Sequence, residues 1–447
     1  MKSTISTGLS FNIYFFFFFS ISSLLFGQNP IIIDDEFKSV SSQNDIYYYE
    51  DKTSNLTIQD ILQSDSIKFQ PLVVKTNLGF TRSAFWVRME LMNKRKIVSH
   101  PITVIKAEYP EIDYIDFYQI SDSNRIVKST KTGTMRPVDS RSRPDEAFVF
   151  LSSIPPDQTN SIFIRVESET PIMLQFSILS MDKYLKENHW RTLFLGIYIG
   201  IFLLAIGYYS LLYFRLKDKS FLFLAISGFL LLCDILASRQ FAFINLWPDY
   251  IFWNKISVPI FDSLMFIFFI FFIIEFLELK KYLFTWFRIL QAIALILMLL
   301  AILVPFSDLY ILKQLILVFM IFALIAIVPA SFFSVKKGYS PAKFFLVGVL
   351  LISPLGIHFM LTELSILPAS DMGANGYIIA SIFLVLFFSQ AVSDRIKLLK
   401  SDKEKAEMKL QISEEQLALV IKGANLGTWD WDILNNTITR NPRWFEI

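Results

Sequence analysis

Residues 255–277 are KISVPIFDSLMFIFFIFFIIEFL, and stretches of this kind decide how most of the chain folds. A helix crosses the ~30 Å hydrocarbon core of a bilayer with ~20 mostly apolar residues, and this stretch is long enough to do so. Comparable runs occur at about 192–214, 220–238, 286–305, 311–334, 342–363 and 376–393. The sequence therefore predicts a helical domain over 190–393 with seven membrane spans, and the lipid bilayer as a partner.

The composition agrees with a membrane protein. Of 447 residues, 53% are hydrophobic and 18% are charged, and the 46 Phe lie mostly in long apolar runs. The formal net charge of +2 gives no case for nucleic-acid binding. Cys233 is the single cysteine, so the sequence excludes an internal disulfide and a cysteine-based zinc site. We expect no metal and no cofactor.

Residues 1–27 have the layout of a secretory signal. Lys2 precedes an apolar stretch from Phe11 to Phe26, and Gly27 stands before the polar QNP. Cleavage near Gly27 is the favoured prediction and an uncleaved membrane anchor is the alternative. Both versions export the chain that follows.

Residues 28–186 are mixed in polarity and predict strands. In SAFWVRMEL (83–91), apolar residues from Phe85 to Leu91 alternate with Trp86, Arg88 and Glu90, which is the pattern of a half-buried strand. SIFIRVES (161–168) and IMLQFSILS (172–180) repeat it, and turn-forming segments at 131–146 and 152–160 lie between. We predict an exported all-β domain, an antiparallel sandwich of short strands.

The loop charges predict the orientation of the spans. With the β domain outside, the inner loops hold nine basic residues and the outer loops hold three. The inner set is Arg215, Lys217, Lys219, Lys280, Lys281, Arg288, Lys336, Lys337 and Lys343, and the outer set is Arg239, Lys255 and Lys313. We expect a multi-pass protein of the bacterial inner membrane with a cytoplasmic C-terminus.

Residues 394–422 are highly charged and lack Gly and Pro, so they predict a helix that leaves the membrane. Eight positions at alternating steps of three and four form a mostly apolar seam: Ile396, Leu399, Lys403, Ala406, Leu410, Ser413, Leu417 and Val420. A parallel coiled coil, and hence a homodimer, is the favoured interpretation. A solitary charged helix is the alternative.

The order of these parts resembles the bacterial seven-transmembrane receptors with diverse intracellular signalling modules. The resemblance covers about residues 35–395 and includes the stretches FWVRMEL (85–91), RPVDSRSRPDEAFVF (136–150) and IFIRVES (162–168). It implies that the exported domain is similar to a carbohydrate-binding jelly roll that senses ligands. It also implies an effector at the inner end, such as a histidine kinase, a diguanylate cyclase or a phosphatase.

The last residues, LALVIKGANLGTWDWDILNNTITRNPRWFEI (417–447), resemble the start of a PAS sensor domain. We expect a strand at 427–432, a turn at Asn435 and Asn436, and a second strand at 437–440. Residues 423–447 are too few to close a sheet or to fold alone. We therefore expect either a fragment of a longer receptor or a truncated gene, with a chance hairpin as the alternative interpretation of the pattern.

Motifs for catalysis are missing from the sequence. It has no Gly-rich phosphate loop and no His-Glu-x-x-His, and His100, His189 and His358 are far apart. The seventh span contains no Lys for a retinal Schiff base. We predict a receptor input half without enzyme activity of its own. A transporter or channel with an exported binding domain is the alternative, although we find no internal repeat of the transporter kind.

Five exported residues are suited to contact a small-molecule or carbohydrate ligand. Aromatic and guanidinium groups stack on sugars or pair with acids, and the candidates are Trp86, Arg88, Arg141, Arg143 and Arg165. Arg88 with Glu90, and Arg165 with Glu167, equally suit charge pairs across a sheet face.

Three ionisable residues fall within the predicted spans, where each costs on the order of 3 kcal/mol. Asp234, Asp262 and His358 lie at roughly similar depth below the outer surface, by ~1.5 Å of rise per residue. We predict that they face the bundle interior as one polar cluster that binds a ligand or responds to protonation. The alternative is that each bonds a neighbour separately and locks helix packing.

Overall fold

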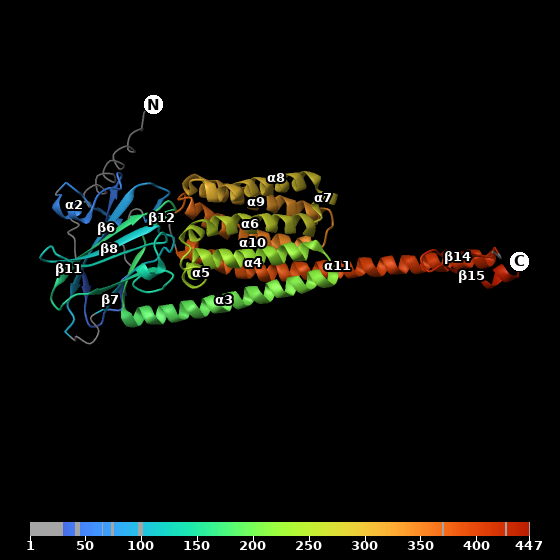
Figure 1. Ribbon diagram of the computed structural model, residues 1–447, viewed down its shortest axis with the longest axis horizontal. Helices are drawn as coiled ribbons and strands as arrows, with labels where there is room; N and C mark the ends of the chain where they lie inside the picture. Colours follow the sequence, from blue (N-terminus) through green and yellow to red (C-terminus); the bar gives the residue numbers. More distant parts are fainter. Residues whose placement is uncertain are drawn as a thin grey trace, which may run out of the picture.

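The computed structural model describes residues 30–40, 45–64, 66–72, 76–96, 102–368, 371–424 and 427–446. The predicted secretory signal at 1–27 lies outside the described residues. Two packed sheets lie at one end of the molecule and a helical bundle follows them (Figure 1). The helix α11 (Asp371–Gly423) then leaves the far end of the bundle and carries a small hairpin away from it.

The larger sheet has seven strands among the described residues, in the order β4-β3-β6-β11-β8-β9, with β1 beside β6. All of its pairs are antiparallel except β1 with β6. Its strands are β1 (Ile31–Ile33), β3 (Ile46–Asp51), β4 (Gln70–Pro71), β6 (Ala84–Asn93), β8 (Tyr114–Ser121), β9 (Ile126–Thr132) and β11 (Thr159–Glu167).

The smaller sheet has the order β10-β7-β13-β2 and packs against the larger one. Its strands are β2 (Ser39–Val40), β7 (Ile102–Ala107), β10 (Phe148–Ser153) and β13 (Phe176–Ser180). Phe117 of the larger sheet stacks on Phe150 of the smaller sheet, with ring centroids 4.7 Å apart, inside a shared apolar core. The predicted β-sandwich is therefore present.

The two faces of β6 separate as its alternation predicts. Phe85, Val87, Met89 and Leu91 lie in the core between the sheets. The opposite face is shielded from solvent around Trp86, whose side chain is fully buried beneath the short helix α2 (Ile58–Gln63). A capping box between Thr57 and Asp60 fixes the start of α2 and so holds this cover in place.

The predicted strand IMLQFSILS is wrong in one respect, because the structure divides it into two strands. Residues Ile172–Met173 form β12, which pairs with β5 (Asn77–Gly79), whereas β13 pairs with β7 and β2. Leu174 and Gln175 between them bond to Thr76 and Glu108 instead. The alternation survives the break, since Ile172, Leu174, Phe176 and Ile178 all enter the same core.

Seven helices among the described residues are long and apolar enough to cross a membrane, as the sequence predicts. They are α3 (Met181–Leu216), α4 (Lys219–Ser238), α6 (Ile251–Phe276), α8 (Phe284–Leu303), α9 (Leu309–Lys336), α10 (Ala342–Glu363) and α11 (Asp371–Gly423). Short helical turns lie between some of them: α5 (Phe241–Asn245), α7 (Leu279–Tyr282) and the 3-10 turn η3 (Val304–Phe306).

The sandwich joins the bundle without a linker. β13 ends at Ser180 and α3 begins at Met181, where the Ser180 hydroxyl accepts a hydrogen bond from the Lys183 amide at 3.3 Å. The helix therefore begins inside the stretch predicted for the exported domain (28–186). A strand that continues directly into a helix transmits displacement better than a flexible connection.

An aromatic cluster locks α11 against the bundle. Phe272 and Phe276 of α6, Phe345 of α10 and Phe388 of α11 are each buried, with ring centroids 5.0–6.0 Å apart. Because α11 then runs unbroken to Gly423, the span and the helix beyond it form one rigid element.

The C-terminal hairpin has the predicted strands, β14 (Trp429–Asp432) and β15 (Thr437–Arg440), followed by the 3-10 turn η4 (Pro442–Phe445). The left-handed turn residue is Asn436, with φ of 50°. Trp429, Trp431 and Ile438 expose about half of their surface.

Candidate functional site

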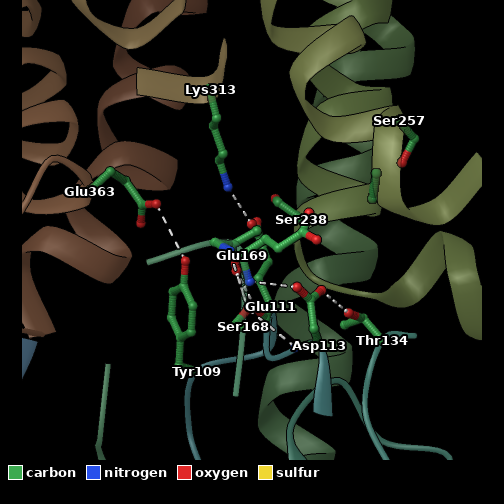
Figure 2. A network of polar contacts seen from close by, with 12 residues as sticks. Tyr109, Glu111, Asp113, Thr134, Ser168, Glu169, Ser238, Ser257, Lys313 and Glu363 are labelled. Carbon is green, nitrogen blue, oxygen red and sulfur yellow. Dashed lines mark hydrogen bonds and ion pairs between the residues drawn. The ribbon is translucent and has the colours of Figure 1, made fainter. Parts of the chain in front are cut away.

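A buried polar junction joins the sandwich to the bundle, and it is built around the loop between β7 and β8 (Figure 2). Lys313 of α9 places its Nζ 2.6 Å from Oε2 of Glu111 in that loop. The two side chains are only 7% and 16% exposed. Both charges are largely removed from water, so the pair is stable mainly because each charge compensates the other.

Tyr109 of the same loop reaches a different helix. Its hydroxyl donates to Oε2 of Glu363, at the end of α10, over 3.3 Å. Burial, followed by the negative charge of Glu363, raises the pKa of Tyr109 well above its usual value, so the phenol stays protonated and donates. One loop thus bonds to both α9 and α10.

Asp113 anchors the other end of this loop. Its carboxylate accepts from the backbone amide of Glu169 at 2.8 Å and from the Thr134 hydroxyl at 3.0 Å. Burial raises the pKa of Asp113 despite these two hydrogen bonds. Glu169 in turn pairs with Lys255 of α6 at 2.7 Å, which brings a third helix into the junction.

Close packing at the α10–α11 connection adds to the junction. Asn77 donates through Nδ2 to the Thr362 carbonyl at 2.7 Å and accepts from the Ser365 hydroxyl at 3.1 Å. Gly79 has φ of +74°, and a Cβ there would lie 2.3 Å from Ser365 Oγ. A side chain at this position would therefore require a shift at Gly79 or Ser365, and the left-handed backbone would be strained as well.

The predicted ligand residues of the sheet lie on one face but are already engaged. Arg165 is the register partner of Trp86, and Arg88 is the partner of Phe163. Arg88 pairs with Glu90 at 2.7 Å and Arg165 with Glu167 at 2.6 Å, as the charge-ladder alternative expects. Whether these three residues also contact a ligand stays a prediction.

Arg141 and Arg143 lie on the loop after β9, near the bundle. Arg141 is buried against Phe148 and donates to the carbonyl of Asp145 and to Oε1 of Gln240, just beyond α4. Burial lowers the pKa of Arg141 to about 10. The Arg143 guanidinium lies 5.5 Å from the ring centre of Tyr184 in α3. Both arginines therefore contact or adjoin the bundle, and their role toward a ligand is likewise untested.

The three predicted intramembrane residues have different surroundings. Asp262 of α6 interacts electrostatically with Lys313 and Glu111, so it belongs to the junction. Asp234 is buried on α4 and interacts electrostatically with Tyr198 of α3. His358 of α10 has a buried Nε2 that makes no hydrogen bond to the described residues. A single cluster of all three stays a prediction.

The bundle's far end has a second buried polar junction, centred on Arg395 of α11. Its guanidinium donates to Asp218 at 3.1 Å and to Glu278 at 2.6 Å, and it also bonds to the Tyr339 hydroxyl. Asp218 lies between α3 and α4, Glu278 between α6 and α7, and Tyr339 between α9 and α10. One side chain thus ties α11 to three far-end connections.

Sequence reasoning missed most of these residues. Lys313 counted only as a loop charge, and Tyr109, Glu111, Glu363 and Arg395 had no assigned role. One signal could have found them: an ionisable residue at the end of an apolar run indicates a nearby partner, because an unpaired charge there is costly. The sequence does not reveal which distant residue supplies that partner.

Replacing Lys313 with Met should lower the free energy of unfolding by about 3–5 kcal/mol, because Glu111 would stay buried without its counter-charge. Denaturant titration of the nanodisc-embedded protein, followed by tryptophan fluorescence, measures this. The matched control is Arg82→Ala, which removes an exposed sandwich–bundle pair with Asp308 (75% and 46% exposed) and should cost less than about 1 kcal/mol. Adding Glu111→Gln to Lys313→Met should recover much of the loss. If Lys313→Met and Arg82→Ala lowered the free energy of unfolding by similarly small amounts, the buried pair would not hold the two domains as we argue.

Comparison with protein families assigns both halves of this architecture. Residues 191–395 match the family described as 7TM diverse intracellular signalling. Residues 43–180 match the family described as 7TMR-DISM extracellular 2. No curated protein sequence matches the chain. The two matched segments cover most of the helical bundle and nearly all of the sandwich. The junction is the contact between them, since Tyr109 and Glu111 belong to one segment and Lys313 and Glu363 to the other.

Proposed function

We propose that this chain, which belongs to the 7TMR-DISM family of membrane receptors, senses an extracytoplasmic ligand and passes the signal to a cytoplasmic effector. The family assignment supplies a receptor input module with an extracellular domain and a seven-helix membrane region. The observation that carries the proposed relay is Arg395, which ties the unbroken helix α11 to three connections of the bundle. We propose no catalytic role for these segments.

The proposed input step is a displacement of the β7–β8 loop. A ligand that reshapes the sandwich would shift Glu111 and Tyr109, and these side chains are bonded to α9 and α10. β13 would pull on α3 at the same time, because no linker separates them. The helices would then carry the shift to Arg395 and turn or tilt α11.

The carbohydrate-like ligand is part of this proposal. Arg88, Arg141, Arg143 and Arg165 remain candidate contacts, with guanidinium groups suited to sugars or acids. Trp86 remains a candidate only for a ligand that displaces α2, which covers its ring. Arg141 has the most direct route to the bundle, through its hydrogen bond to Gln240. A ligand that attracts this guanidinium would loosen a sandwich–bundle contact.

The alternative function, a transporter or channel, has less support. A transport path needs polar groups along its length, whereas the bundle cavity is lined almost wholly by apolar side chains. The polar groups at both ends are instead held in pairs across the junctions. This arrangement favours a bundle that transmits helix movements over one that conducts solutes.

The proposed orientation puts α11 in the cytoplasm. The N-terminal domain is extracellular in this family, and an odd number of crossings leads to the other side of the membrane. The excess of nine basic residues over three in the loops favours the same orientation.

A reporter enzyme that is active only in the cytoplasm should be active when fused after Lys400 and inactive when fused after Ser180. Ser180 lies just before the first apolar helix, and Lys400 lies beyond the seventh span predicted at about 376–393. Activity in whole cells, normalised to the amount of each fusion protein, is the measurement. The reverse pattern would overturn the orientation.

We propose that α11 pairs with the α11 of a second copy. Beyond the bundle its apolar seam is bare: Leu410 is 61% exposed and Leu417 is 62% exposed. Leu and Val side chains left in water at this spacing are stabilised when a parallel partner covers them. The hairpin that follows would be the start of a PAS domain, whose remainder would cover Trp429 and Trp431.

Single cysteines introduced at Leu410 or Leu417 should form cross-links between chains much faster than a cysteine at Lys409. Lys409 is the matched control, since it is one position from the seam on the same exposed helix. Non-reducing gel electrophoresis of membranes after mild oxidation measures the rates. Equal rates at all three positions would argue for an unpaired helix.

A further inference from the structure

The bundle contains a cavity of about 130 Å³, which is lined by six helices: α3, α4, α6, α9, α10 and α11. Its walls are apolar and aromatic, with Phe202, Phe266, Phe269, Phe359 and Phe388 among them. An apolar protein cavity of about 150 Å³ is large enough for benzene. The space therefore suits a single aromatic ring or a short alkyl chain.

Among the described residues that line this cavity, Asp262 is the one Asp, Glu, Lys, Arg or His. It lies about 16 Å along α6 from Ile251, by the rise of an α-helix. Met265, Phe266 and Phe269 follow it on the same face of α6 and also line the cavity. A molecule that bonded to Asp262 would thus lay its apolar part along this face.

The hydroxyl groups of the cavity wall are largely satisfied without a ligand. Ser227 donates to the Met265 carbonyl, Ser381 donates to the Ile378 carbonyl, and the Tyr209 hydroxyl shares a hydrogen bond with Ser389. No hydrogen bond between described residues ends on the Asp262 carboxylate. Asp262 is only partly buried and lines the cavity, so its side chain borders this space.

The surroundings of Asp262 hold more negative than positive groups. Asp262, Glu111 and Glu363 all interact electrostatically with the single ammonium group of Lys313. Lys313 is bonded directly to Glu111, at 2.6 Å. Buried charges are stable only when they are paired. A second cation beside Asp262 would relieve this imbalance.

A smaller polar cavity of about 30 Å³ lies at the junction beside this site. Its wall includes Glu111, Lys255, Pro259 and Lys313, and Pro259 stands about one helical turn before Asp262. The carboxylates of Glu111, Asp113 and Glu169 also line it, beside the ammonium groups of Lys255 and Lys313.

We propose that the bundle cavity binds a small organic ammonium ion, with an aromatic or short alkyl body, whose ammonium group donates hydrogen bonds to the Asp262 carboxylate. The apolar body lies along Phe266 and Phe269, where an aromatic ring face also attracts the cation. This site is separate from the ligand site proposed for the sandwich, and it holds whether or not that proposal does.

The chemistry of the walls narrows the ligand class. A metal ion needs several oxygen or nitrogen ligands, and no group of three such acidic, His or Cys side chains gathers in the described residues. An anion would face the carboxylates. A neutral apolar molecule would fill the cavity but leave Asp262 without a partner.

The test uses the full chain in lipid nanodiscs and 4-fluorobenzylammonium as the probe, followed by ¹⁹F NMR after subtraction of the signal from empty nanodiscs. We expect saturable binding with half-saturation at or below about 1 mM. Asp262→Asn keeps the shape of the side chain and should weaken binding about tenfold or more, because a charge-assisted hydrogen bond is lost. The neutral isostere 4-fluorobenzyl alcohol should bind the native protein about tenfold more weakly as well.

Two further variants make the outcome decisive. Glu275→Gln removes an exposed carboxylate from the same helix, far from the cavity, and should leave binding within about twofold. Ala380→Phe fills part of the cavity while Asp262 is retained, and it should abolish saturable binding even if Asp262→Asn fails to fold. Equal binding of the alcohol, undiminished binding by Asp262→Asn or Ala380→Phe, or no saturable binding by the native protein would each overturn the proposal.

Discussion

The buried ion pair between Glu111 and Lys313 sets the position of the sandwich on the bundle. Its 2.6 Å contact joins a loop of the sandwich to the second turn of α9, where both side chains are largely removed from water. Removing two charges from water costs several kcal/mol, and their attraction repays this only in good geometry. The pair therefore fixes one relative placement of the two domains more than it adds net stability. Tyr109, Asp113 and Lys255 extend the same constraint to α10 and α6.

The constraint at this end has a counterpart at the other. Arg395 is buried among Asp218, Glu278 and Tyr339, which belong to three separate connections of the bundle. The long helices between the two junctions are packed by large side chains, such as Phe272, and close-packed interiors transmit strain. We propose that the two polar junctions, joined by rigid helices, form a physical route by which both ends bias one arrangement, as coupling between sites requires.

The sequence predicted the elements well because their signals are local. Alternation placed Phe85 to Leu91 in the core, and run length located seven spans, each from neighbouring residues alone. The junction depends on pairs such as Tyr109 and Glu363, which lie 254 residues apart, and no local pattern specifies such a pair. Trp86 shows the same limit. The alternation correctly placed it on the face away from the core between the sheets, but only the tertiary fold reveals that α2 covers that face. The break between β12 and β13 was missed because the burial pattern continues through it.

The central claim is that the two polar junctions are coupled. It is tested most directly by removing the Glu111–Lys313 contact and measuring hydrogen exchange at the far end of the bundle. Exchange would be followed by mass spectrometry in the connections that hold Asp218, Glu278 and Tyr339, in the native protein and in a variant with Lys313 replaced by Met. If the two junctions are coupled, these distant amides exchange faster in the variant, since the bundle no longer holds a single arrangement. Faster exchange confined to the β7–β8 loop and the adjoining helix ends, with the Arg395 region unchanged, would contradict the account.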